Sequence, residues 1–84
     1  RQRFFEQYKN SEYTLIFYES CHRIEKFLDD LLEIFGPDRT VCVAREITKI
    51  YETFNIGTLA MVCKNVKKQS KKGEFVILVA KEQF

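Results

Sequence analysis

The sequence predicts a single small α/β domain with a mixed sheet of four to five strands and packed helices. Three observations lead to this prediction. The chain has 84 residues, which is room for one hydrophobic core. Short apolar runs typical of buried strands alternate with longer segments of helical periodicity. Hydrophobic residues make up 45% of the chain and charged residues 31%, a balance typical of globular rather than disordered proteins.

The first half of the chain predicts a helix end, a strand and a long helix. Residues 1–9 carry an aromatic stripe at helical spacing, and residues 13–18 (YTLIFY) form an aromatic and β-branched run typical of a buried strand. Ser20 is the expected N-cap of the next helix, so that His22 and Arg23 would lie in its first turn. Gly36 followed by proline ends that helix.

The second half predicts two strands, a helix and a final strand. Residues 40–44 (TVCVA) form a second buried strand, and residues 51–56 alternate polar and apolar side chains, as in a half-exposed strand. A helix with one apolar face then covers residues 59–66. Residues 75–80 (FVILVA) are the most apolar segment, so we expect them at the centre of the sheet.

The candidate site lies at the ends of the first two strands. The order strand, helix, strand predicts a βαβ unit, whose parallel strands present their carboxyl ends at one edge. The first strand runs into ESCHR and the second into REITK, and a carboxylate of the third strand can approach the same edge. These candidates are Glu19, Ser20, Arg23, Arg45, Glu46, Thr48, Lys49 and Glu52.

Two readings of the arginines stay open at this point. Arg23 beside free backbone N–H groups is suited to an anion site, but it can equally pair with Glu19 or Glu46. Arg45, which is followed by Glu46, can form a purely structural ion pair. No catalytic dyad follows from the spacing alone, so we name no catalytic residue.

A lysine cluster and three cysteines complete the chemically interesting side chains. The lysine cluster either is a solvent-exposed helix end that the helix dipole favours, or it contacts an RNA backbone. The cysteines form no C-x-x-C pair and His22 is the only histidine, so no metal site is expected. Cys21 is a half-buried filler or, beside His22, a nucleophile. The candidate RNA-backbone contacts are Lys67, Lys68, Lys71 and Lys72.

Charge and hydropathy exclude some classes of protein. The net charge of +2 does not by itself indicate nucleic-acid binding. No apolar run approaches the roughly 18–20 residues of a membrane span, so no membrane partner is expected. Scattered thiols fit a reducing cytoplasm. Since Arg1 stands where an initiator methionine would, we expect a piece of a longer protein.

At these same segments the chain resembles a known family. Residues 14–23 (TLIFYESCHR) are similar to the TLIFYESPHR segment of the small-subunit ribosomal RNA methyltransferase I group, with Cys21 where that group usually has proline. Residues 35–54 resemble its FGPDR…VARELTK..ETF stretch. Residues 57–59 (GTL) and 72–79 (KGEFVILV) match its C-terminal pattern.

The resemblance implies that residues 1–84 are the C-terminal lobe of a two-domain enzyme with the tetrapyrrole-methylase fold. Such enzymes use S-adenosylmethionine to methylate a cytidine ribose 2′-hydroxyl of 16S ribosomal RNA in the small ribosomal subunit. The resemblance further implies a missing N-terminal domain, a homodimer, and a cofactor and substrate cleft between the domains. The matching positions that would line this cleft are Glu19, Ser20, Arg23, Arg45, Glu46, Thr48, Lys49, Glu52 and Thr53.

Two other functions remain alternatives to this fragment of a methyltransferase. The first is a stand-alone RNA-binding module that uses the lysine cluster and the edge arginines. The second is the lobe of a methylase of the same fold that acts on a tetrapyrrole of the precorrin type. An isolated lobe holds half of a cofactor site at best, so we expect the 84-residue chain alone to be inactive.

Overall fold

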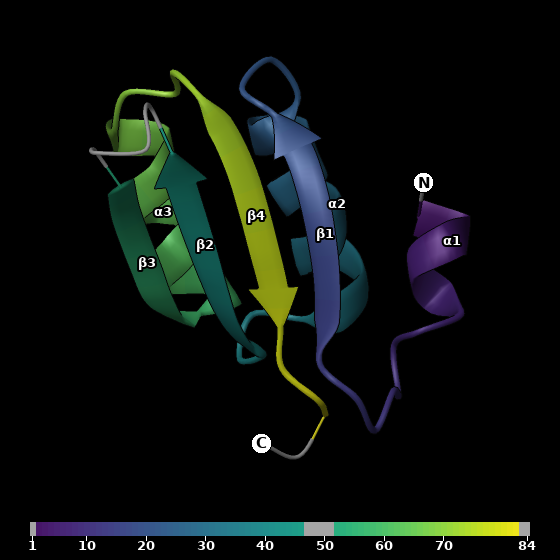
Figure 1. The fold of residues 1–84 in the computed structure, drawn as a ribbon. Coiled ribbons are helices and arrows are strands. Elements are labelled where there is room, and N and C mark those ends of the chain that lie inside the picture. The colour runs from purple at the N-terminus through teal and green to yellow at the C-terminus, as the bar shows by residue number, and fades with distance from the viewer. Residues whose placement is uncertain (1, 47–51, 83–84) are drawn as a thin grey trace.

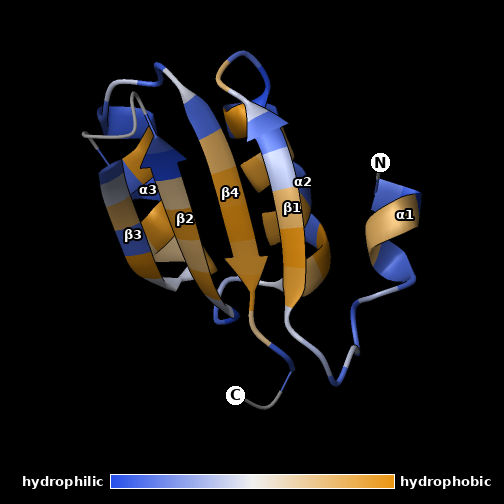
Figure 2. Cartoon of the chain, in the orientation of Figure 1, coloured by the Kyte–Doolittle hydropathy of each residue, from blue (hydrophilic) through white to orange (hydrophobic). Residues whose placement is uncertain are grey.

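The computed structural model describes residues 2–46 and 52–82 and contains one four-stranded sheet, in the order β1-β4-β2-β3 (Figure 1). Its strands are β1 (Leu15–Ser20), β2 (Thr40–Glu46), β3 (Glu52–Thr58) and β4 (Glu74–Val79). The predicted small α/β domain is confirmed, and β4 occupies the central position expected for the most apolar segment (Figure 2).

The pairing of the strands differs from the sequence expectation. β1 and β2 run in the same direction, as a βαβ unit requires, but β4 lies between them. All three hydrogen-bonded pairs are therefore antiparallel. The late, highly apolar β4 takes the most buried place because there it can pair on both edges. The carboxyl ends of β1 and β2 still lie at one edge of the sheet (Figure 1).

Two helices cover one face of the sheet, and no other described element covers the opposite face (Figure 1). The covering helices are α2 (Ile24–Phe35) and α3 (Leu59–Lys68). Their apolar stripes pack on Val41, Val43 and Ile77 to form the hydrophobic core. In the described part of the chain, no helix is long and apolar enough to cross a membrane.

The short helix α1 (Gln2–Glu6) joins this core through one aromatic side chain. The Phe5 ring is buried and meets the rings of Phe17, Phe27 and Phe35 at centroid distances of 5.5, 5.3 and 6.1 Å. Such tilted and edge-to-face contacts are favourable beyond their burial. The aromatic stripe predicted for residues 1–9 thus places one ring in the core, whereas Phe4 and Tyr8 remain exposed.

The start of α2 lies later than predicted. Ser20 is the last residue of β1, residues 21–23 form a turn, and α2 begins at Ile24. Arg23 is the N-cap and makes no side-chain cap hydrogen bond. The prediction of Ser20 as the N-cap is therefore wrong, because the strand pairing of Ser20 with Glu74 extends β1 to this residue.

The start of α3, in contrast, carries a side-chain cap. Thr58 has extended backbone angles, and its Oγ1 accepts a hydrogen bond from the backbone N–H of Met61 at 3.3 Å. We expect Thr58→Ala to lower the free energy of unfolding by about 1 kcal/mol, because one N–H of the first turn loses its partner. Urea denaturation measures this, with Thr58→Ser as the control that keeps the cap. Equal stability of Thr58→Ala and the parent chain would contradict this role.

Candidate functional site at the carboxyl edge of the sheet

The strand register places four polar side chains in one row across the edge of the sheet. Ser20 of β1 pairs with Glu74 of β4, Glu74 with Glu46 of β2, and Glu46 with Glu52 of β3. Since side chains alternate between the faces of a sheet, all four share the face that the helices leave uncovered. We call Glu46, Glu52 and Glu74 the acidic row.

The acidic row is a concentration of like charge. Glu46 stands directly opposite both Glu52 and Glu74, an arrangement that destabilises a sheet when nothing compensates the charges. No ion pair joins these three carboxylates to a cation within residues 2–46 and 52–82. The row therefore offers carboxylate oxygens that are able to accept hydrogen bonds or to pair with a cationic group.

Glu74 is the member that the sequence analysis missed as a site residue. It lies in the KGEFVILV segment at the start of β4, whereas the predicted site residues lie at the ends of strands. Because β4 runs antiparallel to β1 and β2, its first residue meets their last residues. The sequence alone does not mark Glu74 as a site residue, because its place beside Ser20 and Glu46 depends on the strand order.

The register row next to the acidic row points toward the helices, and its member Arg45 has a structural role. Glu19, Phe75, Arg45 and Thr53 are in register there. Arg45 donates from Nε to Thr53 Oγ1 at 3.2 Å and from Nη1 to the backbone carbonyl of Ser70. Arg45 thus ties β3 and the segment after α3 to β2, and no described ion pair joins it to Glu46.

Arg23 lies apart from these rows. It lines a groove of about 840 Å³ between α1 and α2, together with His22 and Lys26. No ion pair connects Arg23 with Glu19 or Glu46, both of which are described residues. Arg23 thus lines this groove, and its role as an anion-binding residue stays a prediction.

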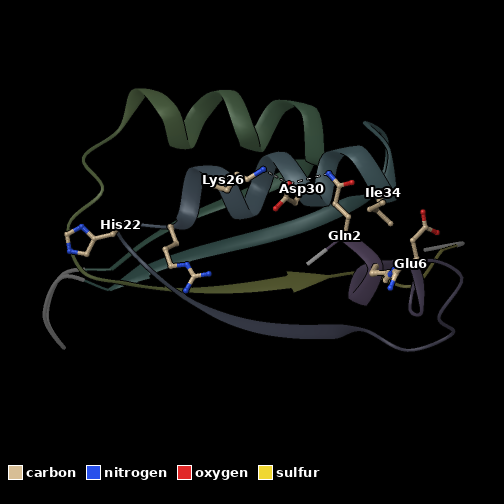
Figure 3. Close-up of a pocket in the computed structure, with 8 residues that line it drawn as sticks. Gln2, Glu6, His22, Lys26, Asp30 and Ile34 are labelled. Carbon is tan, nitrogen blue, oxygen red and sulfur yellow. Dashed lines mark hydrogen bonds and ion pairs between the residues drawn. The ribbon is translucent and has the colours of Figure 1, made fainter.

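The floor of that groove is a satisfied polar contact rather than an open charge. The Asp30 side chain is buried, and its Oδ1 accepts hydrogen bonds from Gln2 Nε2 at 3.3 Å and Lys26 Nζ at 3.1 Å (Figure 3). Lys26 and Gln2 converge on Asp30, whereas His22 lies at the far end of the groove (Figure 3). This contact holds α1 against α2.

Two candidates, Thr48 and Lys49, lie outside the described residues. The structure thus brings together Ser20, Glu46 and Glu52, adds Glu74, and gives Arg45 a supporting contact with Thr53.

The lysine cluster is only partly available to a ligand. Lys67 Nζ pairs with Asp29 Oδ1 at 3.0 Å, and Lys71 Nζ pairs with Glu25 Oε2 at 2.9 Å. The hydrogen bond from Lys67 to Asp29 raises the pKa of this lysine. Two of the four candidate RNA contacts are thus engaged with α2. Lys68 and Lys72 are exposed.

The cysteines behave as apolar side chains. Cys21 packs against the core, as its reading as a filler predicts. Cys63 is buried, its thiol donates to the Leu28 carbonyl at 3.7 Å, and burial raises its pKa. Within the described residues, no group of three or more histidine, cysteine, aspartate or glutamate side chains is able to hold a metal ion.

Comparison with known proteins identifies the class to which this α/β chain is related, namely RNA-modifying methyltransferases. No family model matches the chain. The ribosomal RNA small subunit methyltransferase I of Xylella fastidiosa is 54% identical over 68 residues, which cover 79% of this chain and 25% of that protein. Proteins with the same name from Halalkalibacterium halodurans and Synechocystis are 44% and 38% identical, over 94% and 95% of this chain and 27% and 29% of theirs.

The resemblance found from the sequence motifs is thereby confirmed. The chain belongs to the ribosomal RNA small subunit methyltransferase I family. It spans about a quarter of the length of the relatives that it matches. A methyltransferase needs a methyl donor, so a donor site is expected somewhere in the longer relatives.

Proposed function

We propose that this chain is the C-terminal domain of an S-adenosylmethionine-dependent methyltransferase that modifies a cytidine ribose 2′-hydroxyl of 16S ribosomal RNA. The observation that carries this proposal is the similarity to methyltransferases of that name over 79–95% of the chain. We further propose that the acidic row and Ser20 form one wall of the cleft between this domain and an N-terminal domain. The cytoplasm as its location and a homodimer as its assembly are parts of the same proposal.

The chemistry of the acidic row supports this assignment. Carboxylates accept hydrogen bonds from ribose hydroxyls and pair with ammonium or sulfonium groups. S-adenosylmethionine carries all of these groups, and when bound it supplies the methyl group. Glu46, Glu52 and Glu74 fit the role because no described cation neutralises them. A carboxylate beside the RNA 2′-hydroxyl would orient it and accept its proton during attack.

The RNA-binding alternative receives less support from the geometry. In its lysine cluster, Lys67 and Lys71 are paired with acidic side chains of α2, which leaves fewer ammonium groups for a phosphate backbone. Lys68 and Lys72 remain as contacts that assist binding of ribosomal RNA by the longer enzyme.

We expect Glu46→Gln in the longer protein to lower kcat/KM for 16S ribosomal RNA by roughly 10–100-fold. The reason is that a hydrogen bond to a charged group is worth about 1.5–3 kcal/mol. Stability should not fall, because the substitution relieves repulsion from Glu52 and Glu74. Mass spectrometry of 2′-O-methylcytidine after reaction with small subunits measures the activity.

The matched control is Glu33→Gln, an exposed carboxylate on α2 outside the edge of the sheet. Full activity of Glu46→Gln, Glu52→Gln and Glu74→Gln would remove the acidic row from the active site. No methylation of 16S ribosomal RNA by the longer protein would remove the proposed function itself. Methyl transfer by the 84-residue chain alone would refute the need for a second domain.

A further inference from the structure

The sheet face opposite α2 and α3 carries exposed aromatic and aliphatic side chains beside the acidic row. We call this surface the open face, since no described element covers it (Figure 1). Its largest side chains have exposed fractions between 57% and 78%, namely those of Ile16, Tyr18, Phe54 and Ile56. The sequence prediction of a buried first strand is therefore correct for one face of β1 only. Exposed apolar groups beside unpaired polar groups are typical of a binding surface.

One part of the open face combines an aromatic ring with two polar groups. Tyr18 and Ser20 are alternate residues of β1, so both side chains lie on this face, about 7 Å apart along the strand. On the neighbouring strand β4, Val76 is in register with Tyr18, and Glu74 is in register with Ser20. Because the valine is small and the Tyr18 ring stands largely in solvent, a flat ligand is able to stack on the ring. Its edge then faces Ser20 and Glu74.

Ser20 and Glu74 differ in their hydrogen-bonding abilities. Their strands are paired, so the two residues lie about 4.8 Å apart. Within residues 2–46 and 52–82, the Ser20 hydroxyl and the Glu74 carboxylate have no hydrogen-bond or ion-pair partner. A hydroxyl donates or accepts, whereas a carboxylate only accepts. This pair therefore matches the edge of cytosine, where N3 accepts a hydrogen bond and the N4 amino group donates one.

We propose that Tyr18 stacks the base of the target cytidine and that Glu74 accepts a hydrogen bond from its N4 amino group, while Ser20 donates to N3. The inference rests on the proposed function and adds the group that selects the nucleotide. Unpaired RNA bases are commonly held by stacking on aromatic side chains and by hydrogen bonds to their edges. Glu46 and Glu52 remain available for the ribose.

Uracil differs from cytosine at the two atoms that face this pair. Its O4 accepts a hydrogen bond, and its N3–H donates one. The Ser20 hydroxyl rotates to suit either ring nitrogen, but the Glu74 carboxylate is unable to donate to O4. Glu74 is therefore the residue that distinguishes the two pyrimidines, whereas the Tyr18 ring stacks on both equally well.

The adenine of S-adenosylmethionine also carries an amino group, but the shape of the open face favours RNA. Small cofactors bind in concave sites that bury most of their surface. The open face is instead a strand surface whose rings stand largely in solvent, and single-stranded nucleic acids stack their bases on such rings. Phe54 lies three strands from Tyr18 in the same register row, about 14 Å away, and offers a ring to another base of the strand.

The test compares two substrates of the longer protein. They are small subunits whose 16S ribosomal RNA carries either cytidine or uridine at the methylated position. We expect the parent protein to prefer cytidine in kcat/KM by about 10–100-fold. Glu74→Gln should reduce this preference at least about fivefold, because its amide is able to donate to uracil O4. Mass spectrometry of 2′-O-methylcytidine and 2′-O-methyluridine measures both rates, and Glu33→Gln is the control that should keep the preference.

The role of the ring is tested with Tyr18→Ala. It should raise KM for small subunits about tenfold with either nucleotide and leave KM for S-adenosylmethionine unchanged, because stacking tolerates both pyrimidines. Tyr18→Phe keeps the ring and should restore KM. Tyr13→Ala is the matched control, since Tyr13 is 77% exposed but precedes β1. Circular dichroism of the variants should match that of the parent, because these side chains are largely exposed.

The outcomes separate this inference from the proposed function. Methylation of cytidine with an undiminished preference in Glu74→Gln overturns the inference and leaves the proposed function intact. A rise of KM for S-adenosylmethionine alone in Tyr18→Ala would assign the ring to the adenine of the cofactor, which also overturns the inference. If the parent protein methylates neither substrate, the proposed function itself is wrong, and the inference falls with it.

Discussion

Arg39→Ala is expected to lower the free energy of unfolding by about 2–4 kcal/mol, because a buried guanidinium loses several partners at once. Arg39 Nη2 donates to the Lys9 carbonyl at 2.7 Å, and Nη1 donates to the Ala80 carbonyl at 3.3 Å. Its guanidinium carbon also lies 4.9 Å from the centroid of the Phe35 ring. One side chain thus joins the segment after α1, the end of β4 and the end of α2.

The loss of stability arises mainly from the two backbone carbonyls that lose their hydrogen-bond donor. Arg39 is buried, and this burial lowers the pKa of its guanidinium, whereas the charge of Glu82 raises it. Without the guanidinium, the two carbonyls must find water or stay unpaired, and an unpaired buried acceptor costs about 1–3 kcal/mol. Because arginine has a rigid planar fork, lysine cannot reach both carbonyls.

Urea denaturation followed by circular dichroism measures the effect of Arg39→Ala. Arg39→Lys should recover about half of the loss, since one hydrogen bond and the charge over Phe35 remain possible. Asp38→Ala, at the exposed neighbouring position, should stay within about 0.5 kcal/mol of the parent. A similarly small change for Arg39→Ala would contradict its role as a clamp.

Phe5→Ala is expected to have the largest effect on stability, a loss of about 3–5 kcal/mol. Phe5 is almost completely buried and contacts Phe17 of β1 as well as Phe27 and Phe35 of α2. Its removal leaves a cavity at the centre of these rings. A helix of five residues such as α1 does not form alone in water, so it should detach from α2 when this anchor is lost.

Denaturation gives the loss of stability, and limited trypsin digestion reports the release of α1 by faster cleavage at Arg3 and Lys9. Phe4→Ala is the matched control, because Phe4 neighbours Phe5 in the same helix but is 49% exposed. We expect at most about 1 kcal/mol for that variant. Unchanged stability and cleavage of Phe5→Ala would show that α1 is not part of the cooperative core.

Much of the fold follows from local patterns. Apolar runs predict β1, β2 and β4, and the glycine after Phe35 correctly ends α2, since Gly36 has φ of 87°. The local pattern wrongly predicts Ser20 as the cap of α2, because the strand pairing of Ser20 with Glu74 competes with capping and is not visible locally. A local signal thus fails where a distant strand provides the stronger contact.

The sequence predicts the candidate site only in part, because residue spacing does not contain the contacts between distant segments. Strand ends and family motifs identified Ser20, Glu46 and Glu52 as edge residues, and the register places them in one row. Arg23 instead lines the groove between α1 and α2, because the turn at residues 21–23 carries it away from the row. The roles of Arg39 and Glu74 depend on contacts across more than 20 residues, which residue spacing does not contain.

By itself, then, the sequence determined the order of elements, the most buried strand and, through its motifs, the methyltransferase family. Only the tertiary structure decided that β4 enters between β1 and β2, that three carboxylates meet at one edge, and that both described sheet-covering helices lie on the same face. The physical reason is that both faces of β1 carry large aliphatic and aromatic side chains, Ile16 and Tyr18 on one and Leu15 and Phe17 on the other. Which of these two sets is buried depends on the face against which α2 and α3 pack.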